Sequence, residues 1–422
     1  MTSVARTRGP TLDDTLDNGL RLVVEERHLG PGVATVLTYG VGARHEREGQ
    51  HELAHLFEHL MFEGSPEVAR GEHFTLVAAA AGNLNAMTAF DYTAYFHTVP
   101  AGRLDLVLWL EAQRMADLRI TAEGFETQRR VVAGEHRQRR ENMPYGSARD
   151  NLLERVFPPG HPYHLSMQSH AELERASLAD VQAFFDTYYI PNNAVLTVVG
   201  DVEAARVRDR VEHHFAAIAR RPAIPEPPPP PPLTRRGGHR ATIADRVPLP
   251  RIYYGWAVAP EGTADADAFE VLVTLLGTGR GGLLYRRLVH ELELAGDVTL
   301  EWYGLVAGSS FLLASTTARS GVAAEALESA FDAVLAEAAG RCAEPDELAR
   351  GRALLRRATL DRDARSVGRA FGLGVAATVH GSPHWADTHP TDLVAVSAER
   401  VRRAAAALLP PADRVVLTYV PA

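Results

Sequence analysis

Two histidines and a glutamate share one short segment of the chain, ELAHLFEHLMF at Glu52–Phe62. On a helix that turns about 100° per residue, His55 and His59 fall about 40° apart with Glu58 beside them, while the apolar residues gather on another face. Two histidines four residues apart can both reach one tetrahedral zinc ion, and an adjacent carboxylate can reach the water that completes the zinc coordination. The H-x-x-E-H spacing therefore predicts zinc-assisted hydrolysis with Glu58 as the general base.

Two histidines do not complete a zinc site, so a third ligand must come from elsewhere in the chain. Helical geometry makes Glu135, in the segment ETQRRVVAGEHRQRREN, the best candidate. Bound zinc lowers the pKa of its water toward about 7, and Glu58 would take the proton as the hydroxide attacks a peptide carbonyl. The alternative is that His55 and His59 are polar residues on a solvated helix face, because a five-residue motif also arises by chance.

The composition of the 422-residue chain, 46% hydrophobic and 23% charged, is typical of a soluble globular protein. Its length suggests two large folding units. The net charge of −9 gives no reason for nucleic-acid binding, which is typical of basic domains. All 44 basic residues are arginine, and together with the many Ala, Gly and Pro residues this looks like GC-rich bacterial coding.

Neither a targeting segment nor a cysteine framework is evident. The amino terminus, MTSVARTRGPTLDD, lacks the apolar core of a secretory signal, and no apolar run approaches the roughly 20 residues of a spanning helix. We therefore expect a cytoplasmic protein without membrane contact. The single cysteine, Cys342, allows no internal disulfide and no thiolate zinc cluster, so any metal must be held by His and carboxylate side chains. We expect Cys342 to be an inert buried thiol.

A proline-rich segment divides the chain into two halves. Residues 222–234 read PAIPEPPPPPPLT, and the run from Pro227 to Pro232 can join neither a helix nor a central strand. Such a run forms an extended, semi-rigid spacer. We predict a zinc-binding catalytic domain at 1–221, a linker at 222–237, and a similar domain without a metal site at 238–422.

The two halves end in similar segments, SLADVQAFFDTYYIPNNAVLTVVG from Ser177 and SAERVRRAAAALLPPADRVVLTYV from Ser397. In each, a serine suited to an N-cap opens an amphipathic helix, a proline (Pro191 or Pro411) closes it, and a run containing Val-Leu-Thr forms a strand. The same offset separates the two serines and the two prolines. We interpret this as an internal duplication, with chance similarity of two common helix–strand units as the alternative.

The rest of the chain mixes strands with helices. The expected elements are strands at Leu20–Glu25, Gly32–Gly40, Asn83–Val99 and Arg251–Ala257, a helix at His51–Phe62, and long helices as far as about Asn142. Hairpin-like strands among helices indicate an α+β fold of two similar domains, each a largely antiparallel sheet packed with helices.

An ordered series of segments in the first half carries a family resemblance. These segments are LDNGLRLVVEE, GVGARHE, HLFEHLMFEGS, NLNAMTAFDYTAYFHTVP, LWLEAQRM, RRVVAGE, HPY and YYIPNNAVLTVVGDV. On these motifs the chain resembles the pitrilysin/insulinase family of inverted-motif zinc metallopeptidases, especially its half-length bacterial members, which are similar to mitochondrial processing peptidase.

The resemblance implies a role for each residue of the site. It makes Glu58 the catalytic base, and it gives the zinc ligands as His55, His59 and Glu135. Asn85 and Ala86 match the edge strand that binds an extended substrate as an added β-strand. In the family, two similar α+β domains face each other and, with two more domains, enclose a chamber for unfolded or short peptides. The implied substrate is therefore a peptide or an unfolded protein segment.

The sequence departs from the family pattern at two places. Members usually have an acid seven residues before the third ligand, where this chain has Gln128, which can still hydrogen-bond a ligand but carries no charge. We expect this change to alter the activity of the site without abolishing it. In the second half, the family's substrate-binding Arg and Tyr align with Val289 and Gly296, neither of which has a side chain that donates a hydrogen bond. We therefore expect a heterodimer in which a second peptidase-like subunit supplies the Arg/Tyr pair.

Three rival interpretations remain. The chain could be a non-catalytic subunit that binds peptides or assembles partners, although a scaffold has no physical need for all four site residues. A zinc hydrolase of small amides is a second alternative, disfavoured by the resemblance. The glycines Gly277, Gly279 and Gly282 spell G-x-G-x-x-G, but a lone match is weak support for a dinucleotide site.

Overall fold

The structure, a computed structural model, describes residues 10–47, 49–164, 169–224, 227, 229–231, 233 and 238–422. The predicted linker at 222–237 lies partly outside the described residues, and the amino-terminal residues 1–9 lie wholly outside them. Every helix in the described ranges is too short or too polar to span a bilayer. The cytoplasmic location stays a prediction.

The chain forms two compact units, and neither is one continuous stretch of sequence. Unit 1 contains Met1–Ala133, Ser169–Pro227 and Thr359–His389, and unit 2 contains Gly134–Gln168, Pro228–Ala358 and Pro390–Ala422. Three of the boundaries fall inside helices, namely α4 (Ala122–His136), α11 (Pro345–Asp363) and α13 (Trp385–Ala395). Each half of the chain thus gives a segment to the other unit, an exchange that no local pattern in the sequence predicts. The domain ranges 1–221 and 238–422 stay a prediction.

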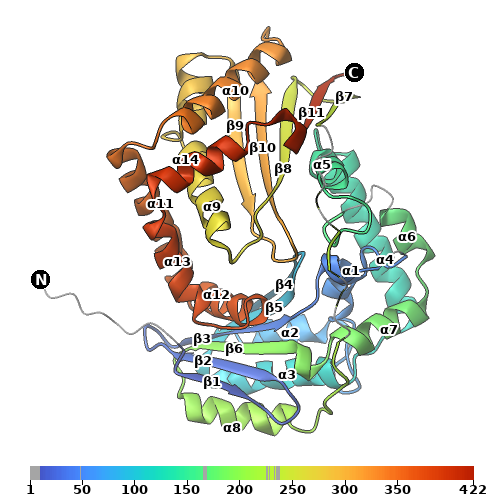
Figure 1. The fold of residues 1–422 in the computed structure, drawn as a ribbon. Helices are drawn as coiled ribbons and strands as arrows, with labels where there is room; N and C mark the ends of the chain where they lie inside the picture. Colours follow the sequence, from blue (N-terminus) through green and yellow to red (C-terminus); the bar gives the residue numbers. More distant parts are fainter. Residues whose placement is uncertain are drawn as a thin grey trace, which may run out of the picture. The chain divides into compact units, whose positions relative to one another are not determined.

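Unit 1 is built on a six-stranded sheet in the order β1-β2-β6-β3-β5-β4 (Figure 1). Neighbouring strands are antiparallel except β2 and β6, which are parallel. The strands are β1 (Leu12–Thr15), β2 (Arg21–Glu26), β3 (Gly32–Tyr39), β4 (Asn83–Thr88), β5 (Thr93–Pro100) and β6 (Ala194–Gly200). The single strand predicted at Asn83–Val99 is a hairpin, because a turn closed by the bond from the Ala89 N–H to the Tyr92 carbonyl, 2.9 Å, separates β4 from β5.

Helices cover both faces of this sheet. One face shares a hydrophobic core with α1 (Leu53–Leu60), α3 (Leu104–Ala116), α7 (Leu178–Tyr188) and α8 (Ala204–Phe215). On the other face, α12 (Ser366–Val379) packs on β3 and β6 through a cluster that includes Ala370 and Leu373. Because α12 comes from the second half of the chain, unit 1 is closed by a helix more than 160 residues beyond its last strand, β6 (Ala194–Gly200).

Unit 2 has a five-stranded sheet in the order β7-β11-β8-β10-β9, with only β7 and β11 parallel. Its strands are β7 (His239–Asp245), β8 (Arg251–Val258), β9 (Ala295–Tyr303), β10 (Ser310–Ala318) and β11 (Arg414–Pro421). One face shares a core with α9 (Ala264–Gly277), α10 (Ala324–Gly340) and α14 (Ala398–Ala407). The other face carries α5 (Ala148–Val156), from the first half of the chain, which packs on β8 and β11. Gly255 permits this approach, because a Cβ there would lie 2.9 Å from Val156.

The two sheets share one topology. With β1 set aside, the orders β2-β6-β3-β5-β4 and β7-β11-β8-β10-β9 correspond strand by strand and carry the parallel pair at the same place. Ser177 and Ser397 are the N-caps of α7 and α14, and each hydroxyl accepts a bond from the N–H three residues on. The predicted α+β fold of two similar sheet-and-helix units is confirmed, and the shared topology supports the duplication.

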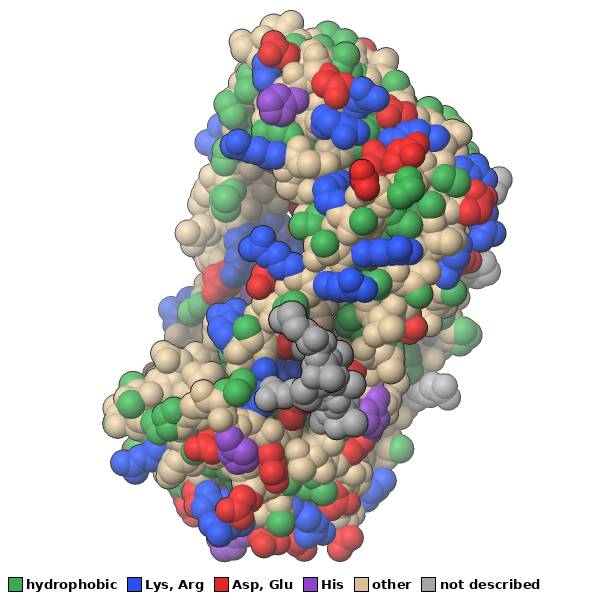
Figure 2. All heavy atoms as spheres, turned by 90° about the vertical axis from the view of Figure 1, so that its left-hand side faces the viewer, with side chains coloured by type: hydrophobic (Ala, Val, Ile, Leu, Met, Phe, Trp, Pro, Cys, Tyr) green, Lys and Arg blue, Asp and Glu red, His purple; other side chains and the backbone are tan. Residues whose placement is uncertain are grey.

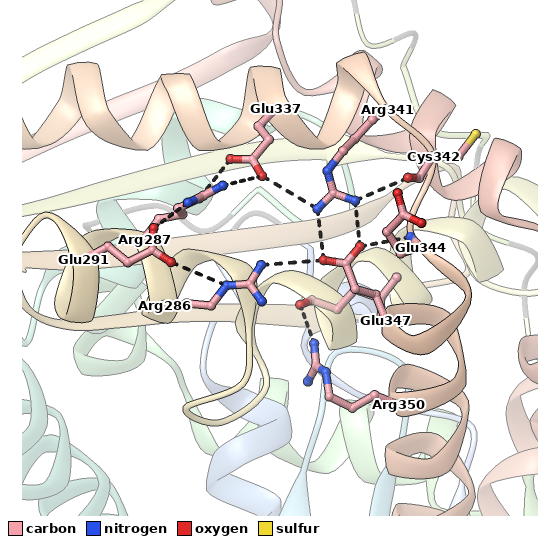
Figure 3. Close-up of polar contacts among 10 residues, drawn as sticks. Arg286, Arg287, Glu291, Glu337, Arg341, Cys342, Glu344, Glu347 and Arg350 are labelled. Carbon is pink, nitrogen blue, oxygen red and sulfur yellow. Dashed lines mark hydrogen bonds and ion pairs between the residues drawn. The ribbon is translucent and has the colours of Figure 1, made fainter.

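Arginine side chains at the surface lie among carboxylates. On the face in Figure 2, Arg side chains (blue) are interspersed with Asp and Glu (red). Figure 3 shows one such network in unit 2, joining the π-helix η5 (Tyr285–Glu291) to α10 and α11. Arg287 bonds both oxygens of Glu337, at 2.9 and 3.0 Å, and Arg341 bonds both oxygens of Glu347, at 2.6 and 2.9 Å. These bidentate pairs join three helical segments in a fixed geometry.

The one cysteine of the sequence, Cys342, is exposed, and its Sγ lies 3.5 Å from Oε2 of Glu399. The prediction of a buried thiol is therefore wrong. Cys342 lies in the short exposed connection between α10 and α11, outside the apolar core that both helices border.

Candidate metal centre

Helix α1 presents its two histidines and Glu58 away from the core. The residues Leu53, Ala54, Leu56, Phe57 and Leu60 are buried, whereas His55, Glu58 and His59 are half-buried. The ring of Phe57 stacks on those of Phe184 and Phe185 of α7, with centroids 5.6 and 6.0 Å apart. This packing fixes the rotation of α1, and with it the direction of the histidine face.

The structure brings His55, His59 and Glu135 together. One potential ligand atom from each of the three lies within 4.8 Å of those from the other two, and the two imidazole centroids are 5.4 Å apart. Glu135 lies in the last turn of α4, which continues as one helix through the unit boundary at Ala133. Two imidazoles and one carboxylate are a donor set that zinc accepts, so the residues present fit this metal. Arg139 forms an ion pair with Glu135 at 3.1 Å, so a bound ion would share that carboxylate with a guanidinium.

Two carboxylates missed by sequence reasoning hold the start of α1. The Oε2 and Oε1 atoms of Glu46 accept the N–H groups of Glu52 and Ala54, at 3.0 and 2.8 Å. Burial, with the nearby Glu52 carboxylate, raises the pKa of Glu46 well above its usual range. Glu172 of α6 (Ser169–Arg175) accepts from the Gly49 N–H at 2.7 Å and contacts Nδ1 of His51 at 2.5 Å. Together they satisfy N–H groups at and just before the first turn of the helix. The only sequence signal for a carboxylate in this role was Glu46, at the end of the GVGARHE segment.

Gln128 bonds a partner that the sequence did not suggest. Its Nε2 donates to Oε1 of Glu63 at 2.6 Å, and the Glu63 side chain, which is only 5% exposed, also pairs with Arg70 at 3.1 Å. Gly124, in the first turn of α4, lets the helix approach, because a Cβ there would lie 2.6 Å from Oε2 of Glu63. Glu63 therefore joins the end of the α1 segment to α4, the helix that carries Glu135. The direct contact of Gln128 with a metal ligand stays a prediction.

Asn85 and Ala86 lie on β4, at one end of the sheet order. Strand β4 runs beside α1, where the Thr88 hydroxyl donates to the Ala54 carbonyl at 3.3 Å. The Asn85 side-chain carbonyl accepts the N–H of Ala86 at 2.9 Å. A side chain thus satisfies a backbone donor of β4, and a peptide that pairs with this strand would take the place of the Asn85 side chain at that donor. The edge-strand position fits the predicted role in peptide binding.

The second half has no substitute for the Arg/Tyr pair at the aligned positions. Val289 is buried in η5, and Gly296 lies on the edge strand β9. The neighbouring arginines Arg286 and Arg287 are each engaged with carboxylates of the network in Figure 3. The glycine run from Gly277 follows helix α9 rather than a strand, unlike the strand–turn–helix context of a dinucleotide site.

A second group of possible ligands, His73, His97 and Glu111, is buried in unit 1 and was not anticipated. The Nε2 atoms of the two histidines lie 3.0 Å apart, and Nδ1 of His97 lies 3.3 Å from Glu111. Arg114 bonds both oxygens of Glu111 and lies over the ring of Tyr95 at 4.2 Å. A divalent cation would have to displace or sit beside this buried guanidinium, so the group is better suited to a closed hydrogen-bond chain than to a metal.

Two family models match the chain. The model described as insulinase, peptidase family M16, matches residues 21–162, and the model described as peptidase M16 inactive domain matches residues 175–355. The first match contains all four proposed site residues. The second contains Val289 and Gly296.

Relatives agree with these matches. The chain is 32% identical to the zinc protease PqqE of Helicobacter pylori over 76% of this chain and 73% of that protein. It is 25% identical to the mitochondrial-processing peptidase subunit beta of Caenorhabditis elegans over 63% of this chain and 57% of that protein. A crystal structure of a protease from H. pylori superposes with a TM-score of 0.88 at 26% identity, covering 98% of this chain and all of that one. The predicted family resemblance is confirmed.

Proposed function

Because the chain belongs to peptidase family M16, the insulinase family, we propose that it is a zinc-dependent endopeptidase that cleaves peptides or unfolded segments. The observation that carries this proposal is the convergence of His55, His59 and Glu135, whose potential ligand atoms lie within 4.8 Å of one another. Glu58 lies on the same helix, one residue before His59.

The proposed mechanism assigns one task to each of these side chains. His55, His59 and Glu135 would hold zinc, which when bound supplies a Lewis acid and a water of lowered pKa. Glu58 takes a proton from the attacking water and delivers it to the departing amine, as a general base and then a general acid. The extended substrate pairs with the backbone of β4 near Asn85 and Ala86, which aligns the scissile bond beside α1.

We also propose that a second peptidase-like subunit completes the active site. Val289 and Gly296 cannot donate side-chain hydrogen bonds to a substrate carbonyl, and a donor aimed at the developing oxyanion contributes substantially to rate. One relative is named as a beta subunit, which supports a divided site. The partner would be a chain of similar fold that supplies Arg and Tyr.

A non-catalytic peptide-binding or assembly subunit is the second candidate. It is favoured by the match of residues 175–355 to a domain described as inactive. It is disfavoured by the complete set of two histidines, Glu135 and Glu58, because peptide binding along a strand edge requires none of them.

Zinc content and hydrolysis together test the proposal. The purified chain, alone and mixed with a similar chain that contains the Arg/Tyr pair, is assayed with a quenched peptide while elemental analysis measures zinc. We expect about one zinc per chain and hydrolysis that requires the mixture. Glu58→Gln should retain zinc and lose hydrolysis, whereas Glu123→Gln, an exposed residue of α4, should change neither. Zinc-free chain without hydrolysis in any mixture would favour the non-catalytic alternative, and full turnover by the chain alone would refute the need for a partner.

A further inference from the structure

The residue just before α1 has an unusual backbone. Glu52, the N-cap of the helix, has φ 72° and ψ 3°, in the left-handed region that favours glycine. Within the described residues, the other non-glycine residues with positive φ are Ala81, Tyr145 and Glu293. A glutamate in this conformation carries backbone strain, which persists only where the surrounding contacts fix it.

The Glu52 carboxylate contacts a proposed zinc ligand. Its Oε2 lies 3.2 Å from Nδ1 of His55, and the two side chains are 17% and 22% exposed. An imidazole that donates its Nδ1–H to a carboxylate keeps Nε2 as the free lone pair, in a fixed tautomer and orientation. This is the arrangement in which carboxylates raise the basicity of a metal-binding histidine.

One bond that anchors Glu52 in the fold does not depend on its side chain. The contact that anchors the residue, the 3.0 Å bond to Glu46, is made by its backbone N–H, which any residue except proline would provide. Its carboxylate lies near enough to the buried Glu46 carboxylate to oppose ionisation of that group. Glycine at this position would therefore remove the backbone strain and keep the bond from the backbone N–H to Glu46.

We propose that Glu52 is a positioning residue that fixes and polarises His55 for zinc, at the expense of stability in the metal-free chain. This inference rests on the proposed zinc site. A purely structural role would make replacement of Glu52 lower the stability of the metal-free chain. The proposed role instead predicts that replacement by glycine lowers the zinc affinity and raises the stability of the metal-free chain.

The test compares three variants of the full chain. Glu52→Gly removes the carboxylate and the strain, and Glu52→Gln keeps the strain and an acceptor oxygen without the charge. Glu293→Gly is the matched control, because it makes the same substitution at φ 52°, on an exposed residue of unit 2. Two quantities are measured for each: the zinc dissociation constant, by competition with a chromophoric chelator, and the thermal midpoint of the metal-free protein.

We expect Glu52→Gly to bind zinc about 10- to 100-fold more weakly than the wild type, while its metal-free midpoint rises by about 2–4 °C. Glu52→Gln should bind zinc with intermediate affinity. Its metal-free thermal midpoint should not rise, because the backbone strain at this position remains. Glu293→Gly should raise the midpoint and leave zinc affinity unchanged. Zinc affinity of Glu52→Gly equal to that of the wild type overturns the inference while the zinc site stands. A wild-type chain that binds no zinc overturns the proposed function and this inference with it.

Discussion

Nε2 of Gln128 donates a hydrogen bond of 2.6 Å to Oε1 of Glu63. The pair gives a physical reason for an amide where the family pattern has an acid. The Glu63 side chain is buried and pairs with Arg70 on one side, so a donor such as the Gln128 amide suits its other oxygen better than a second carboxylate would. The hydrogen bond to Glu63, a residue five positions after Glu58, therefore explains why position 128 has glutamine where the family pattern has an acid.

Gln128→Glu should destabilise the protein, because it puts a second carboxylate within hydrogen-bond distance of Glu63. We expect a loss of about 1–3 kcal/mol in the free energy of unfolding at pH 7, measured by urea denaturation. The double variant Glu63→Gln with Gln128→Glu restores one donor and one acceptor and should recover most of that loss. Simple additivity of the two single changes would contradict this coupling.

Arg369→Met should strongly destabilise unit 1. Arg369 of α12 is buried and bonds Glu25 of β2 at 2.8 Å and both oxygens of Asp387, at 2.7 and 3.0 Å. Its removal takes a buried guanidinium away from two half-buried carboxylates, which costs about 3–5 kcal/mol in the free energy of unfolding. Arg206→Met is the control, because Arg206 pairs with Glu203 at the exposed start of α8, and an exposed pair of this kind is worth about 1 kcal/mol or less. Equal effects of the two variants in urea denaturation would refute the anchoring role of Arg369.

Stability should fall as the pH drops below about 6.5, owing to His73 and His97. Burial, with Arg114 nearby, lowers the pKa of both histidines, so the unfolded chain binds protons in this range that the folded chain does not. Their contribution is therefore complete above the unfolded pKa and is lost at lower pH. His73→Gln should flatten the dependence of unfolding free energy on pH by up to about 1.4 kcal/mol per pH unit.

The exposed His28 provides a control of opposite sign. Its hydrogen bond with Asp201 raises the pKa of His28, so its contribution is present at low pH and disappears as the pH rises through the folded pKa. His28→Gln should therefore act above about pH 6.5, where it removes a loss of stability with rising pH, whereas His73→Gln flattens the curve below about pH 6.5. A shift in the same direction for both variants would contradict the assignment.

The network in Figure 3 should make the stability of the protein depend on pH in the acid range. The bidentate bond from Arg341 lowers the pKa of Glu347 to about 2. A carboxyl group with a depressed pKa stabilises the fold above its unfolded pKa of about 4.5, and the stabilisation is lost as the pH falls through about 2. Glu347→Gln should lower the thermal midpoint at pH 7 and reduce its dependence on pH below about 4.5, whereas Asp346→Asn, at the exposed neighbouring residue, should leave that dependence unchanged.

Local patterns in the sequence predicted the parts of the site that depend on one element. The helical spacing of His55, Glu58 and His59 predicted a helix with a polar face, and Ser177 and Ser397 predicted helix starts. These features depend on residues within one or two turns of each other. The family of the chain was predictable because its motifs combine such local features in a fixed order.

The supporting residues could not be predicted in the same way. Glu172 is 121 positions from His51, and Glu63 is 65 positions from Gln128, so nothing in the local pattern pairs them. Glu52 was visible as part of the motif segment, but its positive φ depends on the bonds that Glu46 makes around it. Each of these interactions depends on tertiary packing, which also decided the exposure of Cys342.

The exchange of α5 and α12 has a consequence for how the protein can be divided. A gene fragment that ends at the proline-rich segment encodes a sheet whose apolar face over β3 and β6 lacks its covering helix, and the complementary fragment lacks α5 over β8 and β11. Either fragment produced alone should be insoluble or captured by chaperones. Produced together, the two fragments should complement each other as a split protein, because each contains the helix that covers the exposed sheet face of the other.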